Sequence, residues 1–260
     1  MLVRSWNLFH GNTVPPGRRA YLDEMVRLAT ADGPDVLCVQ EVPAWAIRRF
    51  TVGDVAQAPR AGPVPIPAAL GRVVTEVNHG LLRSLFAGQG NAIQVGRRLR
   101  VLEHDVETLN TRSFRRVEGA ALELDPVARL AWAKERRIVQ AARLQHEDGR
   151  TFLVANTHCS SARDLRIPGA EVWRAARFAV DRSRPGDVVV LAGDFNVPGT
   201  DAAVEALTGA EWGFSQPGPG IDHVLVRGAD ASALRVWDDA RRARGDVLLS
   251  DHAPVEVEIR

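Results

Sequence analysis

The sequence carries almost no net charge, and lysine is nearly absent from it. Its 33 basic and 32 acidic residues leave a formal net charge of +1, and Lys134 is the only lysine. A dedicated duplex-DNA-binding protein usually carries a strong positive excess, so this balance argues against one, while local contacts with phosphates stay compatible with it. The excess of arginine reflects either genome composition or a use of the planar guanidinium in binding phosphate.

Cysteine is also scarce. Cys38 and Cys159 are too few and too far apart in the sequence for a disulfide framework. Neither has the spacing of a metal ligand, which disfavours a structural zinc site. We expect two reduced thiols that are mostly buried.

Long apolar runs are missing as well. No run approaches the roughly 20 residues needed to cross a bilayer. The chain starts with Met1-Leu2-Val3-Arg4-Ser5 rather than with a basic segment and an apolar signal stretch. We therefore expect a cytoplasmic protein without a membrane segment. Its 260 residues, 45% of them apolar, suffice for one large core, and we expect a monomer with a single domain over residues 1–260.

The apolar periodicity predicts a mixture of strands and helices. The stretch 55–72 contains Pro59, Pro63, Pro65 and Pro67, which predicts a long surface loop that either binds a ligand or serves as a spacer. Strands are predicted at residues 2–7, 36–41, 91–95, 117–124, 137–145, 151–158, 187–191, 223–227 and 254–259, and helices at about 21–29, 172–182 and 201–207.

Short polar motifs end many of these apolar runs. Strands of a sheet can bring distant residues to a shared edge, so the recurrence of carboxylates and histidines at strand ends predicts one assembled site. The motifs are Trp6-Asn7, Gln40-Glu41, Asn156-Thr157-His158, Gly193-Asp194-Phe195-Asn196, Ile221-Asp222-His223 and Ser250-Asp251-His252.

Side-chain alternation predicts which members of a motif share a face. Successive strand residues point to opposite faces, so we expect Asp194 and Asn196 on one face and Phe195 in the core. Such a pair either positions a water or a phosphate oxygen or simply forms a turn. By the same rule, Asn156 and His158 share a face.

Two further groups complete the candidate chemistry. A carboxylate bonded to an imidazole fixes its tautomer and raises its basicity, which makes Asp222 and His252 a candidate pair. Asn7, Glu41 and Asp251 supply only oxygen ligands. That set suits a hard ion such as Mg²⁺ or Mn²⁺.

Taken in order along the chain, these motifs, together with Gly90-Asn91-Ala92-Ile93, resemble the endonuclease/exonuclease/phosphatase superfamily, whose members are deoxyribonuclease I-like. The resemblance covers essentially the whole chain. It implies a four-layer α/β sandwich, with two packed and mostly antiparallel sheets flanked by helices and the site at one edge. It also implies roles: Glu41 is the principal metal ligand, with Asn7 and Asp251 nearby; His158 bonds the scissile phosphate; Asp194 and Asn196 orient the attacking water and a phosphate oxygen; Asp222 holds His252.

The resemblance leaves several points open. Either Asp194 or the pair of Asp222 and His252 takes the proton of the attacking water, and either one or two metal ions take part. The acidic partner that the family provides for the histidine at position 158 is Glu76, Glu103 or Glu118. His10 either reaches a phosphate or caps a loop.

The leading functional hypothesis is a metal-dependent phosphodiesterase that uses in-line attack of an activated water, with a nuclease first among the candidates. The alternative is a phosphatase or phosphodiesterase for a small-molecule or lipid-headgroup phosphoester, which the near-neutral charge favours. A catalytically silent binding scaffold is the third reading. We expect residues 55–72 and 214–220 to form the loops that select the substrate, since specificity in such folds lies in loops around a shared centre.

Overall fold

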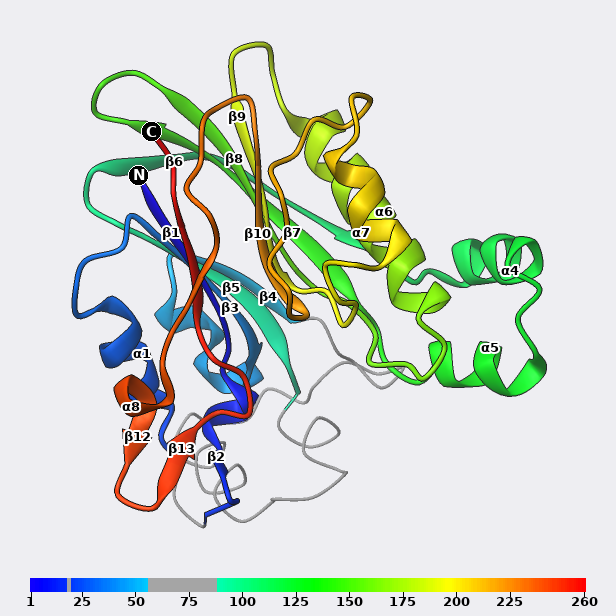
Figure 1. The fold of residues 1–260 in the computed structure, drawn as a ribbon, viewed down its shortest axis with the longest axis horizontal. Coiled ribbons are helices and arrows are strands. Elements are labelled where there is room, and N and C mark those ends of the chain that lie inside the picture. The colour runs from blue at the N-terminus through cyan, green and yellow to red at the C-terminus, as the bar shows by residue number, and fades with distance from the viewer. Residues whose placement is uncertain (18–19, 56–87) are drawn as a thin grey trace.

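The structure is a computed structural model that describes residues 1–17, 20–55 and 88–260, and its fold is a four-layer α/β sandwich (Figure 1). Two large sheets pack face to face. Helix α1 (Leu22–Thr30) covers the outer face of the first sheet, and helix α6 (Arg166–Arg182) covers that of the second. The predicted fold class is confirmed.

The first sheet has six strands in the order β11-β14-β1-β3-β5-β4. They span Arg235–Val236, Val255–Glu258, Leu2–Asn7, Val36–Val42, Gly90–Val95 and Val52–Val55, respectively. β1 and β3 are parallel, with Asn7 opposite Gln40, and the other pairings of these strands are antiparallel. The parallel pair brings the carboxyl ends of β1 and β3 to the same edge of the sheet.

The second sheet has five strands in the order β10-β9-β8-β7-β6. They span Asp222–Arg227, Val188–Asp194, Thr151–His158, Ile138–His146 and Leu99–Thr108, respectively. β8 and β9 are parallel, and their last residues, His158 and Asp194, lie opposite each other. β10 is antiparallel to β9, so its first residue, Asp222, also lies opposite Asp194. Three polar residues therefore meet at one corner of this sheet.

Alternation along the strands divides the core into layers. Val154 and Val190 face the apolar layer between the two sheets, whereas Leu153 and Val189 pack against α6. On the other side of the sandwich, Trp6 packs in the layer beneath α1. Each strand of the central pairs is thus buried on both faces, which fixes the positions of the strand ends.

Smaller elements surround the two sheets. A three-stranded sheet, in the order β12-β13-β2, lies beside the end of β1. Helices α4 and α5 project together from the second sheet, between β6 and β7 (Figure 1). The remaining elements are η1 (Phe9–Gly11), β2 (Thr13–Val14), η2 (Ala44–Arg49), α4 (Arg112–Ala121), α5 (Pro126–Trp132), α7 (Ala202–Glu205), η3 (Ala206–Thr208), α8 (Asp239–Arg242), β12 (Ala243–Arg244) and β13 (Val247–Leu249).

One predicted strand is wrong. Residues 117–124 lie in helix α4 and in the turn after it. The Thr111 hydroxyl caps this helix by accepting a hydrogen bond from the Phe114 backbone N–H at 3.3 Å. Val117 is 62% exposed, so the apparent alternation of this stretch does not mark a buried strand face.

The other predicted strands and helices are confirmed, although α6 begins at Arg166 rather than at residue 172. Among the longer elements, the prediction missed strands β4 and β6 and helix α5. Cys38 and Cys159 are free and buried, as expected. Apart from residue 55, the predicted loop 55–72 lies outside the described residues. Within the described part of the chain, every helix is too short or too polar to cross a lipid bilayer.

Candidate functional site

The polar residues at the strand ends meet at one edge of the sandwich. Asn7 ends β1 and Glu41 lies near the end of β3, while His158 and Asp194 end β8 and β9. The two sheets contact each other here, because the side-chain amide of Asn7 donates to Asp194 Oδ2 at 3.0 Å and to Glu41 Oε1 at 3.3 Å. Residues far apart in the sequence thus share one site.

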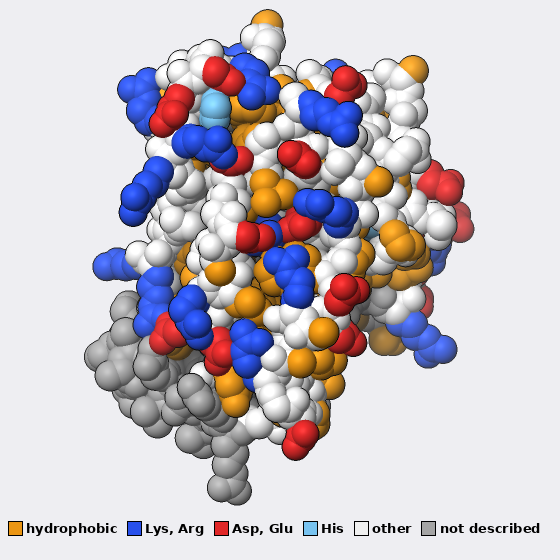
Figure 2. Space-filling model, turned by 60° about the vertical axis from the view of Figure 1, so that its left-hand side comes forward, with side chains coloured by type: hydrophobic (Ala, Val, Ile, Leu, Met, Phe, Trp, Pro, Cys, Tyr) orange, Lys and Arg blue, Asp and Glu red, His pale blue; other side chains and the backbone are white. Residues whose placement is uncertain are grey.

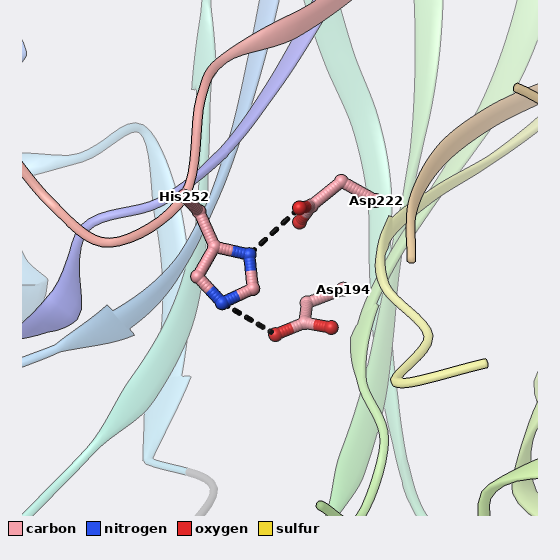
Figure 3. A group of neighbouring side chains, drawn as sticks. All are labelled: Asp194, Asp222 and His252. Atoms are coloured by element: carbon pink, nitrogen blue, oxygen red, sulfur yellow. Dashed lines mark hydrogen bonds and ion pairs between the residues drawn. The ribbon is translucent and has the colours of Figure 1, made fainter. Parts of the chain in front are cut away.

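His252 lies between two carboxylates (Figure 3). Its Nδ1 is 2.7 Å from Asp222 Oδ2, and its Nε2 is 3.7 Å from Asp194 Oδ2. The indole Nε1–H of Trp6 donates to the His252 backbone carbonyl at 2.9 Å and anchors this segment on β1. The structure therefore brings together Asp222 and His252 as the sequence predicts, and it places Asp194 beside them.

These groups change one another's pKa. Burial and the charge of Asp222 raise the pKa of Asp194 to about 7, although His252 and a hydrogen bond from Asn7 act against the rise. Burial lowers the pKa of His252, but the hydrogen bond and charge of Asp222 outweigh it and raise this pKa to about 10. A carboxyl that titrates near neutral pH beside a positive imidazole is typical of acid–base sites.

His158 is held by its neighbours on the same edge. Its Nε2 lies 3.5 Å from Asp194 Oδ2, and the Arg137 Nη1 lies 3.2 Å from its Nδ1 and 3.4 Å from its Nε2. Burial, followed by the positive charge of Arg137, keeps the pKa of His158 well below its ordinary value. His158 is therefore a neutral imidazole.

Two of the three candidates for the acidic partner of His158 lie elsewhere, and the third is not tested. Glu103 pairs with Arg184 instead, and Glu118 lies on α4. Glu76 lies outside the described residues. Within the described part of the chain, the carboxylates that face His158 are those of Asp194 and, at 4.0 Å, Glu41.

Arg137 is a site residue that the sequence reasoning missed. Its side chain is only 5% exposed, and its Nη2 donates to Glu135 Oε2 at 2.5 Å. It directly precedes β7, and the β7–β8 register pairs Val139 with Thr157. That register carries Arg137 to the end of β8, so hairpin geometry was the signal that could have found it.

A bulge aims Glu41 into the site. The register of β3 against β5 shifts between Val39 and Val42, and Glu41 has a φ of 52°. Before the bulge, Gln40 points into the core, where its Nε2 donates to Asn156 Oδ1 at 2.7 Å. Asn156 and His158 share the face toward the first sheet, as alternation predicts.

Strand alternation was predicted to place Asp194 and Asn196 on one face, and this explanation is wrong. Strand β9 ends at Asp194, and Asn196 has a φ of 54°, so the strand rule does not reach it. Asp194 Oδ1 accepts the Asn196 backbone N–H at 3.0 Å in a tight turn, and the Asn196 side-chain amide donates to the Cys159 carbonyl at 3.0 Å. Phe195 is fully buried, as expected. Asn196 thus lies in the site through a turn.

Glycine is required just before this turn. Gly193 has a φ of +140°, and a Cβ there would lie 1.9 Å from the Thr157 carbonyl oxygen. The close approach of β8 and β9 at their ends therefore depends on the missing side chain. It is what allows His158 and Asp194 to lie side by side.

Asp251 borders the site at its exposed side. Desolvation by its surroundings and the charge of Glu41 both raise the pKa of Asp251, so the two carboxylates repel each other. The neighbouring Ser250 hydroxyl donates to the Asn7 carbonyl at 2.6 Å, which ties this segment to β1. Asn7, Glu41 and Asp251, the predicted metal ligands, thus come from segments that meet.

The donor set fits a hard divalent cation. Glu41, Asp194, Asp222 and Asp251 place negative charge on one edge, and only oxygen atoms come from the predicted ligands. Among the described residues, Asp194, Asp222 and His252 also offer three ligand atoms within 4.8 Å of one another. In that group both ring nitrogens already face a carboxylate, so Asn7, Glu41 and Asp251 are the better candidates.

Two further predicted features lie near this edge: His10, which contacts Glu41, and the 214–220 segment, whose end contacts the chain after Asn196. His10 is buried, and its Nε2 lies 3.3 Å from Glu41 Oε2, so it faces the site rather than solvent. Residue 220 accepts a hydrogen bond from Gly199 N at 3.1 Å, which places the end of the 214–220 segment beside the chain that follows Asn196.

Comparison with known proteins identifies relatives of this fold. A sequence model of the endonuclease/exonuclease/phosphatase family matches residues 5–252. A search of curated proteins finds no match. Among solved structures, D. rerio TDP2 complexed with a single-strand DNA product is 13% identical, with a TM-score of 0.62 over 100% of this chain and 98% of that one.

Two further structures are similar. The human Nocturnin catalytic domain with bound sulfate is 17% identical, with a TM-score of 0.58 over 100% of this chain and 94% of that one. The mannosyl-6-phosphatase Bt3783 of Bacteroides thetaiotaomicron is 15% identical, with a TM-score of 0.57 over 100% of this chain and 99% of that one. At these identities the likeness shows a shared fold.

Proposed function

Because the chain belongs to the endonuclease/exonuclease/phosphatase family and is therefore a phosphoester hydrolase, we propose that it is a metal-dependent phosphodiesterase, with nucleic acid as its first candidate substrate. The observation that carries the proposal is the convergence of His158, Asp194 and His252 at the edge that also holds Glu41. These are the groups that hydrolysis of a phosphoester requires.

Asp194 is the residue that we propose as the base. Asp222 holds the His252 ring through Nδ1 at 2.7 Å, which favours a positive imidazole. That leaves the Asp194 carboxylate to accept a proton from water. The water oxygen then attacks phosphorus in line with the departing oxygen, and His252 stabilises the negative charge that develops on the phosphate.

His158 faces the same carboxylate oxygen of Asp194 as His252 does, and Arg137 contacts the His158 ring. In this proposal the neutral His158 ring donates from Nε2, the nitrogen that lies 3.5 Å from Asp194 Oδ2. We propose that it bonds a phosphate oxygen, with the charge of Arg137 behind it. Asn196, held against the Cys159 carbonyl at 3.0 Å, orients the water or a second oxygen from the Asp194 side.

Glu41, Asp251 and Asn7 would hold Mg²⁺ or Mn²⁺. When bound, such an ion supplies positive charge that stabilises the phosphate oxygens in the transition state. Asn7 orients two of the carboxylates through its amide, because it donates to both Glu41 and Asp194.

The test is hydrolysis by the purified protein with Mg²⁺ or Mn²⁺. We expect turnover of single- or double-stranded DNA or of a nitrophenyl phosphodiester, and loss of this turnover in Asp194→Ala. Asp246→Asn, which alters an exposed carboxylate in the turn between β12 and β13, is the matched control. Turnover that survives in Asp194→Ala would remove the assignment.

A phosphatase or phosphodiesterase for small-molecule or lipid-headgroup phosphoesters is the second candidate. The near-neutral net charge of +1 favours it, and basic and acidic side chains are interspersed across the face in Figure 2. Of the similar structures, one is named a mannosyl-6-phosphatase, which indicates a small-molecule phosphoester, and one is TDP2 complexed with a single-strand DNA product. A panel with RNA, sphingomyelin and inositol phosphates separates the two candidates.

A silent scaffold is the remaining alternative. Calorimetry that detects no divalent-metal binding, together with no turnover on the same panel, would support it.

We further propose a monomer in the cytoplasm, where Cys38 and Cys159 stay reduced, as their burial as free thiols allows. Light scattering of the purified protein tests the oligomeric state.

A further inference from the structure

Helix α6 carries a carboxylate that is fully buried and that the proposed chemistry does not use. Glu171 is 0% exposed. It lies on the same helical stripe as Ala175 and Phe178, which pack in the apolar core, so an apolar residue would be expected there. A buried acid on such a stripe needs a specific role, because burying its charge is unfavourable unless hydrogen bonds satisfy it.

Three donors satisfy Glu171. Its Oε2 accepts the Ser160 backbone N–H at 2.6 Å, and its Oε1 accepts the Ser160 hydroxyl at 2.9 Å. Oε1 also accepts the indole N–H of Trp132, the last residue of α5, at 2.6 Å. Two of the three bonds therefore hold one residue, Ser160, which follows His158 by two positions.

The segment between His158 and Ser160 joins the two catalytic strand ends. The Cys159 N–H donates to the Asp194 carbonyl at 2.9 Å, and the Cys159 carbonyl accepts the Asn196 amide at 3.0 Å. A shift of this segment moves His158 relative to Asp194 and frees Asn196 at the same time. Anything that fixes Ser160 thus fixes the spacing within the site.

We infer that Glu171 is a positioning residue for phosphoester hydrolysis, which it serves by holding the Cys159-Ser160 segment and, through it, the relative positions of His158, Asp194 and Asn196. The inference rests on the proposed function. Glu171 contacts neither the substrate nor the reacting atoms. Its effect on the reaction passes through the backbone.

An ionised carboxylate suits this position better than an amide. All three neighbours donate, and only a carboxylate can accept from all of them. Burial raises the pKa of Glu171, while the bonds from Ser160 and Trp132 and the charge of Arg137 act in the other direction. Arg137 therefore has two effects here, since it faces His158 on one side and favours the Glu171 carboxylate on the other.

Three variants separate positioning from a general effect on stability. Glu171→Met removes every acceptor and frees Ser160. Trp132→Phe is the matched control, because it removes one donor from the same carboxylate but leaves both Ser160 bonds. The double variant Trp132→Phe with Glu171→Gln is the rescue: without the indole N–H, the amide oxygen can accept the Ser160 N–H while its NH₂ donates to the Ser160 hydroxyl.

We expect Glu171→Met to lower kcat about tenfold or more with KM changed by less than about twofold. Hydrogen exchange should be faster at the Cys159 amide in this variant. The control and the rescue should keep kcat within about threefold of wild type, although their melting temperatures fall. The inference is overturned if Glu171→Met leaves both kcat and the exchange rate unchanged. It is also overturned if kcat falls in step with the melting temperature in all three variants.

Two further cases need their own readout: a Glu171→Met variant that does not fold, and a wild-type protein without phosphoester hydrolysis. If Glu171→Met does not fold, Ser160→Ala removes one of the two bonds, and we expect it to lower kcat by about threefold; full activity and wild-type exchange in it overturn the inference. If the wild-type protein hydrolyses no phosphoester, the proposed function fails, and exchange at Cys159 then decides alone whether Glu171 holds the segment.

Discussion

His252 Nδ1 lies 2.7 Å from Asp222 Oδ2 in a pair that joins β10 to the segment before β14. The bond fixes the imidazole so that its other nitrogen faces Asp194, and it raises the pKa of His252 against the effect of burial to about 10. Asp222 thus contributes most to the charge of the ring, and the charges of Asp194 and Asp251 act in the same direction.

Asp222→Asn should return the pKa of His252 toward its ordinary value of about 6.5. A histidine whose pKa rises on folding stabilises the fold fully below the unfolded pKa and loses this contribution as pH rises through the folded pKa, here about 10. The variant should thus be most destabilised near pH 6 and least above pH 10. NMR titration of the metal-free protein and denaturant unfolding at several pH values measure both effects, with Asp246→Asn as control.

Arg137→Gln should raise the pKa of His158, because the charge of Arg137 is one cause of its depression. Burial, the larger cause, remains, so this pKa should stay below the ordinary value. We expect kcat/KM to fall about a hundredfold, since the positive charge behind the His158 contact to phosphate is lost. Arg136→Gln alters the exposed neighbour and should leave both quantities unchanged; equal losses in the two variants would contradict the role of Arg137.

Glu41→Gln should weaken Mg²⁺ or Mn²⁺ binding by about tenfold or more, as measured by calorimetry. The same change removes a charge that raises the pKa of Asp251. Without metal, the variant should therefore be as stable as wild type or more so, and the Asp251 pKa should fall. Metal affinity equal to that of wild type would place the ion elsewhere.

Asp187→Asn tests a carboxylate outside the site. Arg143 donates to both Asp187 oxygens at 3.0 Å, and with Thr151 and the Arg184 N–H these bonds outweigh burial and lower the pKa of Asp187. The resulting stabilisation is present above the unfolded pKa of about 3.9 and lost as pH falls through the folded pKa.

We expect this variant to lose about 2 kcal/mol of unfolding free energy at pH 7 and much less below pH 3 or so. Chemical denaturation across this pH range measures the difference. Asp181→Asn, at an exposed position on α6, is the control. A loss that does not depend on pH would mean that the carboxylate charge is not involved.

The central strands could be predicted because they are buried on both faces and strongly apolar. Strand β6 escaped the prediction, since its exposed residues Glu103, His104 and Asp105 interrupt the apolar pattern at a sheet edge. The strand predicted at residues 117–124 lies in helix α4 and the turn after it; Thr111 as a cap and the pair Ala120-Ala121 favour a helix and Gly119 does not. Local propensity on an exposed projection is a weak guide.

The neighbourhood of His158, Asp194 and Asp222 could be predicted, because each lies in a motif at the beginning or end of a strand. Arg137 stands in no motif and could be found only by extending the register of the predicted hairpin, and Glu171 acts through a contact that only the fold creates. Arg137 reaches His158 through the register of a hairpin, and Glu171 reaches Ser160 from a neighbouring helix. A motif can be recognised in a short stretch of sequence. Arg137 and Glu171 instead act on residues that lie close to them only in the folded structure.

The pairing of β1 with β14 has a consequence for how the site comes into being. Asn7 and Ser250, which bond at 2.6 Å, are 243 positions apart. Closing so long a loop is slow and comes late in folding, because its entropic penalty precedes the reward of the contact. Because the segment that carries His252 is tied to β1 through Trp6 and Asn7, we expect His252 to reach Asp194 only when this contact between the two ends of the sequence has closed.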